Sequence, residues 1–237
     1  MGGNIIKKRY FISFISLFFL VILAFKIYVA NNIEKIEISN DVKDKIQNNI
    51  FSYPDINHLK KEYNNNDIIG YILIPNIVET PFVKYSDNNY YKRKNLYKND
   101  DLIGSPFIDY RNIITDKKIV IYGCNLSKYN EPLSNLEKYY NEDYYYSNQY
   151  IYIKINNQVI KYQIFSVYIE LSDWDYTKIK FKDNNEYYNH VSILKDKSWC
   201  DTLVKIHSSD RIIVLQTCSN LDEYKNKPLI ISAKKIQ

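Results

Sequence analysis

The chain has 237 residues, 46% of them hydrophobic and 25% charged, which is the composition of a globular protein and excludes a mainly disordered chain. The length suits one domain of ordinary size with an appendage. Of the net charge of +5, four units come from residues 1–30, which contain four basic residues and no acidic ones. The remaining 207 residues carry 28 basic and 27 acidic side chains. This balance leaves no basic domain to bind phosphates, so no nucleic-acid partner is expected.

The N-terminal part is typical of a membrane anchor. Residues 10–30 are largely apolar, interrupted by Lys26, and about 20 such residues span a bilayer as a helix. The basic run within residues 1–9 favours a cytoplasmic N-terminus and an exported remainder, residues 31–237. A cleaved signal peptide is the alternative, but residues 28–30 make a poor small-x-small cleavage site. The sequence therefore predicts a single-pass protein of the plasma membrane whose domain is extracellular.

The exported part divides into a helical stalk and a β-rich domain. Residues 31–66 contain two segments with apolar residues at three- and four-residue spacing, which predict helices over 33–51 and 55–65. From residue 67 to 237 short β-rich runs alternate with turn residues. The predicted strands cover 68–74, 80–85, 102–109, 117–123, 149–155, 158–171, 210–218 and 228–236, with helices over 86–97 and 184–199. About eight short strands with few helices favour a mainly β fold, a closed β-barrel, over a doubly wound sheet.

Three cysteines, Cys124, Cys200 and Cys218, make an odd count in an exported chain, which is not a disulfide framework. No Cys/His cluster has the spacing of a zinc site, so neither a metal nor another cofactor is expected. Cys218 ends a predicted strand and precedes a polar loop, where a thiol is held by rigid backbone yet open to solvent, as a nucleophile must be. The alternative role for Cys218 is that of a small apolar side chain in the core. We interpret Cys200 as such a packing residue.

The order of the sequence blocks resembles that of sortases, and class B sortases in particular. The resemblance covers roughly residues 35–236 and rests on the blocks GYILIPNIVETPFVKYSDNNYY, GSPFIDYRN, IVIYGCN, YQIFSVYIE and IIVLQTCSN. It implies a sortase-type β-barrel with N-terminal helices. It also implies a cysteine transpeptidase of Gram-positive surfaces, which cleaves a sorting signal after its Thr and holds the acyl group as a thioester. The implied partners are surface proteins that bear the signal and an amine of the cell-wall precursor or of a protein.

The resemblance assigns site residues one by one. Cys218 matches the nucleophile and Thr217 the threonine beside it, while Gln216 replaces the usual serine. The family's histidine lies in a Tyr-Gly-His-Asn segment, and here Cys124 stands in its place, followed by Asn125. A cysteine at this position can donate a proton but is a weak base at pH 7 and brings no positive charge. Thr217, Gln216 and Asn125 are expected to contact substrate.

The family's arginine begins the last strand, and here Pro228 stands at that position with Lys227 just before it. Lys227 could supply charge but not the bidentate geometry of a guanidinium. The segment 171–178 matches the region that lines the substrate groove in sortases. Leu171 and Trp174 are the side chains within it that we expect to contact substrate.

Two functions of different class remain open on this sequence. The first is an active cysteine transpeptidase with Cys218 as nucleophile and an altered acid–base apparatus. The second is a weak or inactive homologue that binds sorting signals or a surface partner, with Cys124 and Cys218 as a redox pair. None of the three histidines, His58, His190 and His207, is expected to replace the missing one, because their places in the chain predict surface or helix-packing roles.

Overall fold

The computed structural model describes residues 23–24, 26, 53–123, 133–156 and 158–236. The chain divides into two compact units, residues 1–52 and 53–237, and the second holds the β-rich domain. The predicted helix over 33–51 lies outside the described residues. Within the described ranges, no helix is long and apolar enough to cross a membrane. This finding contradicts the predicted membrane-spanning helix and single-pass plasma-membrane localisation; of residues 10–30, only 23, 24 and 26 are described.

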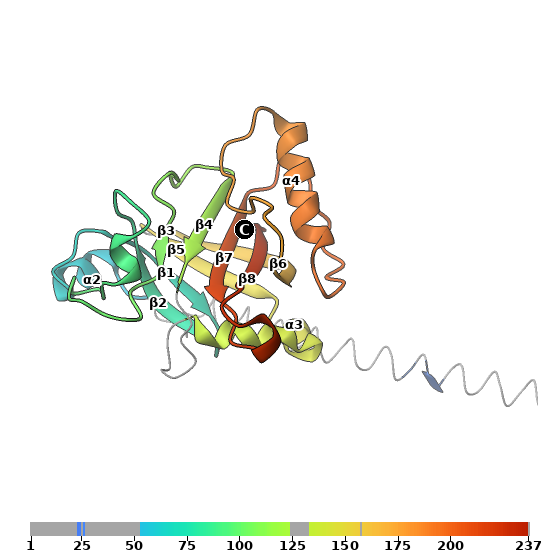
Figure 1. Cartoon of the computed structure of the whole chain (residues 1–237), viewed down its shortest axis with the longest axis horizontal. Coiled ribbons are helices and arrows are strands. Elements are labelled where there is room, and N and C mark those ends of the chain that lie inside the picture. The colour runs from blue at the N-terminus through green and yellow to red at the C-terminus, as the bar shows by residue number, and fades with distance from the viewer. Residues whose placement is uncertain (1–22, 25, 27–52, 124–132, 157, 237) are drawn as a thin grey trace, which may run out of the picture. The chain divides into compact units, whose positions relative to one another are not determined.

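Eight strands form a closed barrel, which confirms the predicted fold class (Figure 1). Around the barrel they follow the order β1-β2-β3-β4-β7-β8-β6-β5. The strands are β1 (Ile68–Ile74), β2 (Val78–Val83), β3 (Phe107–Ile108), β4 (Lys118–Tyr122), β5 (Tyr150–Ile155), β6 (Gln158–Ile169), β7 (Ile212–Cys218) and β8 (Pro228–Lys235). Neighbours pair antiparallel except β2 with β3 and β4 with β7, which run parallel. The parallel pair β4/β7 brings the ends of two distant strands together at one edge of the barrel.

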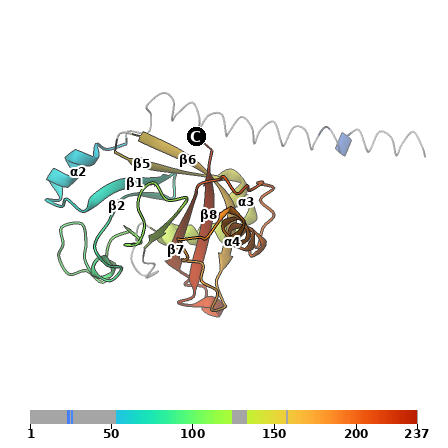
Figure 2. The same cartoon turned by 90° about the horizontal axis from the view of Figure 1, so that it is seen from above.

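Alternation along the strands separates the barrel interior from an outer face that a helix covers. In β7, Ile213 and Leu215 belong to the main core cluster. Their neighbours Ile212 and Val214 belong to a second cluster that includes Leu194 of helix α4 (Asn184–Asp196). Side chains two residues apart on a strand share a face, so Ile212 and Val214 lie on the face of β7 that packs toward α4. Figure 2 shows α4 lying beside β7 and β8.

The helices are short and locally determined. Helix α2 (Ile56–Glu62) confirms the predicted helix over 55–65; its N-terminus is capped by the Asp55 carboxylate, which accepts from two backbone N–H groups. Its buried Ile56 and Leu59 pack in one cluster with Ile68 of β1. Within residues 53–123, 133–156 and 158–236, the further helices besides α2 and α4 are α3 (Glu142–Ser147) and the 3-10 helices η1 (Tyr90–Lys92), η2 (Ser134–Tyr140) and η3 (Asp222–Tyr224).

Two predicted elements are shorter in the structure because loop geometry interrupts them. The strand expected over 102–109 is reduced to β3, since Gly104 adopts a positive φ of 73° that strand residues do not adopt. The helix expected over 86–97 is reduced to η1. After η1, the Asn95 side chain accepts hydrogen bonds from the backbone N–H groups of Tyr97 and Asn99, which closes a turn instead of continuing the helix.

Candidate active site

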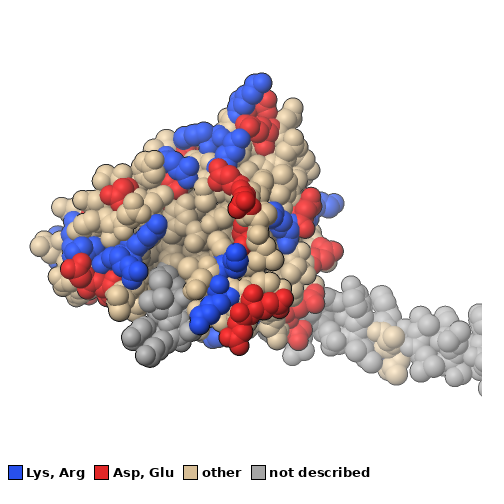
Figure 3. Space-filling model, in the orientation of Figure 1, with Lys and Arg blue, Asp and Glu red and all other residues tan. Residues whose placement is uncertain are grey.

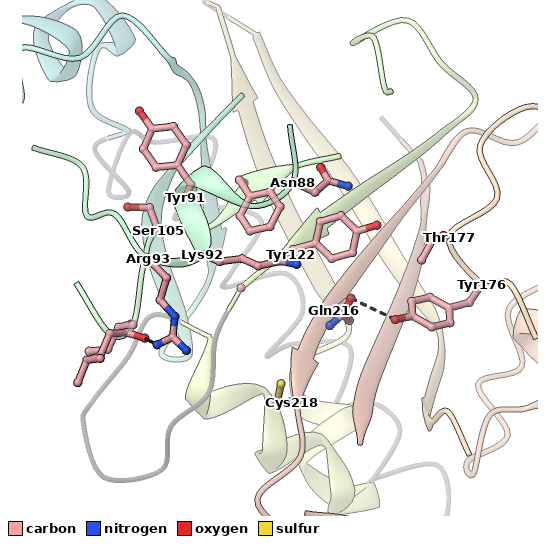
Figure 4. A pocket seen from close by; sticks show the side chains of 14 residues that line it. Asn88, Tyr91, Lys92, Arg93, Ser105, Tyr122, Tyr176, Thr177, Gln216 and Cys218 are labelled. Atoms are coloured by element: carbon pink, nitrogen blue, oxygen red, sulfur yellow. Dashed lines mark hydrogen bonds between the residues drawn. The ribbon is translucent and has the colours of Figure 1, made fainter. Parts of the chain in front are cut away.

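Cys218 ends β7 on its outer face, beyond the part that α4 covers. It is half-buried and carries a free thiol. The thiol opens into a pocket of about 400 Å³ (Figure 4). Gln216, two residues earlier on the same face, lines the pocket as well. A pocket of this size can hold a few side chains of a bound peptide or a small ligand.

The strand beside β7 supplies the pocket's second wall. Tyr122 at the end of β4 lies opposite Gln216 in the parallel ladder, and both line the pocket. The next residue, Gly123, donates its backbone N–H to the carbonyl of Gln216 (2.9 Å). A Cβ at Gly123 would lie 2.1 Å from the side chain of Leu133, so a larger residue here would require the Leu133 side chain to move. Cys124 and Asn125, which follow Gly123, lie outside the described residues.

A buried carboxylate fixes Tyr122. The Tyr122 hydroxyl donates to Asp109 (2.8 Å), and Arg111 donates two hydrogen bonds to the same carboxylate (2.8 and 2.9 Å). Burial opposes ionisation of Asp109, but these donors outweigh it and hold the pKa of Asp109 at about 2. Arg111 also donates to the carbonyl of Thr177 (3.2 Å). The network therefore connects the Tyr122 wall to Thr177, which lines the opposite side of the pocket.

The opposite side is formed by the segment between β6 and α4. Tyr176 lines the pocket and donates its hydroxyl hydrogen to Oε1 of Gln216 (3.1 Å). Burial raises the pKa of Tyr176 to about 12, so the hydroxyl keeps its proton at neutral pH. With its oxygen held by Tyr176, the Gln216 amide turns its nitrogen toward the pocket (Figure 4). The pocket thus contains an oriented N–H donor near the thiol.

A buried lysine holds this segment against β4. Lys118 has no exposed surface; its ammonium donates to the carbonyls of Tyr176 and Lys178 and contacts Nε2 of His190 (2.7 Å). His190 stacks on Trp174 with ring centroids 4.6 Å apart. Burial lowers the pKa of Lys118 to about 7, and burial with the neighbouring lysine lowers that of His190 to about 3. This cluster positions the groove segment and does not line the pocket.

Pro228 occupies the register position directly across from Cys218 in the β7/β8 ladder. It has neither a charge nor a backbone N–H to offer a substrate. Lys227 is exposed, and its backbone carbonyl accepts from Ser219 (2.7 Å); it is not among the pocket-lining residues. Burial raises the pKa of the Cys218 thiol. The thiol is therefore protonated at neutral pH.

The other residues expected to contact substrate are placed differently. Thr217 is fully buried on the opposite side of β7 from Cys218, and its hydroxyl has no hydrogen-bond partner among the described residues. Leu171 is 59% exposed and lies away from the pocket lining, and Trp174 packs on His190 instead. Of the expected groove segment 171–178, Tyr176 and Thr177 are the residues that line the pocket.

The sequence did not point to most of the pocket residues, and three polar ones among them bear on the chemistry of the site. Asn88, Lys92 and Arg93 line the pocket, although the sequence predicted only a helix over 86–97 and no site residue within it. Nothing in the local pattern distinguishes these cations from surface ones, because their position depends on how the segment docks on the barrel. As expected from their places in the chain, His58 and His207 are exposed and His190 is a packing residue. No group of His, Cys, Asp and Glu suited to a metal ion occurs in the described part of the chain.

Comparison with known proteins identifies the family. No family model matches the chain, but sortase B of Listeria monocytogenes is 30% identical over 174 residues, 72% of this chain and 70% of that protein. Sortase B of Staphylococcus aureus is 26% identical over 73% of this chain and 72% of that protein. Among solved structures, Clostridium perfringens sortase B superposes with a TM-score of 0.70 at 27% identity, over 76% of this chain and 99% of that one. A Staphylococcus aureus sortase B–substrate complex gives 0.69 at 21% identity, over 86% and 93%, a likeness of fold. The chain belongs to the sortase family, in class B.

Proposed function

We propose that the protein is a cysteine transpeptidase that cleaves a peptide sorting signal after a threonine and transfers the acyl group to an amine. The observation that carries this proposal is the Cys218 thiol at the strand end, opening into a peptide-sized pocket on a sortase B fold. The relative from Staphylococcus aureus was solved as a substrate complex, which supports a sorting signal as the substrate class here. The acceptor we propose is an amine of the cell-wall precursor or of a protein.

The proposed reaction has two acyl transfers. The Cys218 sulfur attacks the threonine carbonyl carbon, the peptide C–N bond breaks, and the thiol proton leaves with the new amine. The acceptor amine then attacks the thioester, the S–C bond breaks, and the thiol regains a proton from the incoming amine. Because the pKa of Cys218 is raised by burial, the first step requires a group that moves the proton.

Gln216 is the residue we assign to stabilise the oxygen of the reacting carbonyl. Its amide oxygen accepts from Tyr176 (3.1 Å), so its nitrogen is free to donate into the pocket. Oriented amide donors of this kind stabilise the charge that develops on a carbonyl oxygen during acyl transfer. Gln216 thus offers part of what an arginine at position 228 would supply. We assign proton transfer to Cys124, which follows the pocket residue Gly123 in the chain, and only a minor electrostatic contribution to Lys227.

A second function is favoured by a specific observation. Pro228 lies across from Cys218, and burial is the cause of the raised thiol pKa, so the described residues provide no cation that stabilises a thiolate. These features suit a weak or inactive homologue that binds sorting signals, with Cys124 and Cys218 forming a redox pair. In the structure the Cys218 thiol is free.

Intact-mass analysis distinguishes the two functions. The purified protein is incubated with a panel of sorting-signal peptides, with and without reductant, and compared with Cys218→Ala. A thioester adduct on Cys218, or cleavage that the Cys218→Ala variant lacks, would establish the transpeptidase. Peptide binding without adduct or cleavage under reducing conditions would favour the binding function. A mass lower by two hydrogens without reductant, restored by it and absent in Cys124→Ala, would identify the redox pair.

A further inference from the structure

The pocket beside Cys218 is positively charged. Lys92 and Arg93 line it, and none of its described lining residues is acidic. In Figure 4 the Lys92 side chain extends toward Tyr122 and Gln216, whereas Arg93 stays on its own side of the pocket, where it donates to the Leu102 carbonyl. Figure 3 shows several basic side chains left of the central hollow of this face, with acidic side chains among them and at the right rim of the hollow.

Among the described residues neither cation forms an ion pair, although their neighbours do. The acidic side chain that interacts with Lys92 at longer range is Asp87, whose pKa is lowered by two backbone N–H donors and, to a smaller extent, by Lys92. The Lys92 ammonium donates to the side-chain oxygen of Asn89 (3.3 Å), and Arg93 donates to the carbonyl of Leu102 (3.1 Å). Both acceptors are neutral. In the same segment Lys94 pairs with Asp100 (2.8 Å), and Lys98 pairs with Asp67 (3.0 Å). A guanidinium has five N–H donors and an ammonium three, so most donors of Lys92 and Arg93 remain available to a ligand.

The segment that carries the cations is held rigidly on the barrel. Tyr91, which precedes them, is 1% exposed, and its hydroxyl donates to Asp67 (2.7 Å). Its carbonyl accepts from the N–H of Ser105 (2.9 Å), and Gly104 lies so close that a Cβ there would be 2.2 Å from the same carbonyl. Lys92 and Arg93 therefore leave a fixed backbone, and little ordering is required when a ligand binds.

The cations do not act on the nucleophile in this arrangement. The raised pKa of the Cys218 thiol has burial as its cause, and a cation close to the sulfur would oppose that shift. Both side chains line the pocket, so they border the space that a substrate would occupy. A carboxylate is the peptide group that an unpaired guanidinium and ammonium recognise best.

We propose that the pocket selects sorting peptides that carry an acidic side chain, Asp or Glu, next to the cleaved bond, and that Lys92 and Arg93 are the specificity-determining residues. This inference rests on the proposed function, since it assigns a substrate class to the same site. The carboxylate belongs to the peptide being cleaved and not to the amine acceptor. An acceptor amine would meet unfavourable charge in this pocket.

The experiment measures binding, so that it does not depend on turnover. Fluorescent peptides that contain a central threonine are compared in pairs, Asp with Asn and Glu with Gln at each flanking position, using the Cys218→Ala protein. We expect one acidic peptide to bind about tenfold more tightly than its amide isostere, the size of effect that a partly exposed charged contact with two donors provides. The preference should shrink at high salt.

Substitutions test whether Lys92 and Arg93 cause the preference for acidic peptides. Lys92→Met and Arg93→Gln should each reduce it, and together they should abolish it while the amide peptide binds unchanged. Lys94→Met is the matched control: it removes a paired lysine of the same segment that does not line the pocket, and the preference should remain.

Three other results would each refute a different part of the proposal. Equal binding of acidic and amide peptides refutes the acidic specificity and leaves the sortase function intact. A dependence on the carboxylate of the acceptor, tested by competition with glycylglycine and glycylglycine amide, refutes the assignment to the cleaved peptide. Failure of every peptide to bind refutes the proposed function and this inference with it.

Discussion

The resemblance to sortases implies an arginine where Pro228 stands, and the structure gives the size of the effect expected from introducing one. Pro228 lies directly opposite Cys218, and Cβ atoms of directly opposed strand residues are about 4.5–5.5 Å apart and point to the same face. An arginine at position 228 can therefore bring its guanidinium to roughly 5 Å from the sulfur. Pro228 is the first residue of β8. Arginine can take this place without breaking the pairing of β8 with its neighbours.

The magnitude follows from Coulomb's law. Two unit charges about 5 Å apart attract by about 3 kcal/mol at an effective dielectric constant of about 20. Cys218 and position 228 are both partly exposed, so solvent screening reduces this to about 1–1.5 kcal/mol. Since one pKa unit corresponds to about 1.4 kcal/mol, Pro228→Arg should lower the pKa of Cys218 by about one unit.

The assay is the pH dependence of alkylation by iodoacetamide, which reacts with the thiolate. Ile236→Arg is the control of equal charge, because Ile236 is exposed just beyond the far end of β8. Its alkylation profile should match that of the unaltered protein. An unchanged Cys218 profile in a correctly folded Pro228→Arg variant would refute the argument from strand register. In the peptide assay, Pro228→Arg combined with Cys124→His should restore cleavage, if the site has lost activity through these two positions.

Three further predictions concern the groups around the pocket. The unfolded state binds a proton to His190 below pH 6.5, and the folded state does so only near pH 3. The free energy of unfolding should therefore fall as pH falls through this window, by up to about 1.4 kcal/mol per unit; urea titrations of His190→Gln should lose this slope between pH 6.5 and 5. Tyr176→Phe frees the Gln216 amide and should slow peptide acylation about tenfold, measured by adduct formation. Thr217→Val removes a buried hydroxyl without a described partner and should raise the free energy of unfolding by about 1 kcal/mol, measured in urea, without weakening peptide binding.

Each of these predictions has an outcome that contradicts it. A retained slope in His190→Gln would mean that another group titrates in this range. Unchanged acylation in Tyr176→Phe would show that the amide of Gln216 does not depend on its partner. Destabilisation by Thr217→Val would mean that the hydroxyl has a partner in solution, and weaker peptide binding would return Thr217 to the substrate site.

Most of the fold could be predicted from the alternation of apolar and polar side chains along the strands. A period of two with turn residues between the runs predicted β1, β4, β5, β6, β7 and β8 closely, because strand formation here depends on local pattern and burial of one or two faces. The turn between β5 and β6 was visible in the asparagines at 156 and 157, and Asn156 adopts the positive φ of 54° that such turns use. Where a special backbone conformation interrupts the pattern, as at Gly104, the sequence predicted too long a strand.

The sequence by itself determined that Cys218 ends a strand, whereas the expectation of an arginine at position 228 came from the resemblance to sortases. Alternation also required Thr217 to face away from Cys218, but only barrel closure and the position of α4 decided which of these faces is interior. The enclosure of Lys118 likewise depends on the segment packed over it, since a lysine at the start of a strand is ordinarily exposed. The placement of Lys92 and Arg93 in the pocket depends on contacts between residues far apart in the chain, such as Tyr91 with Asp67. Local sequence patterns reflect the preferred backbone conformation and the spacing of buried residues. The charge of a pocket depends instead on which distant segments pack together around it.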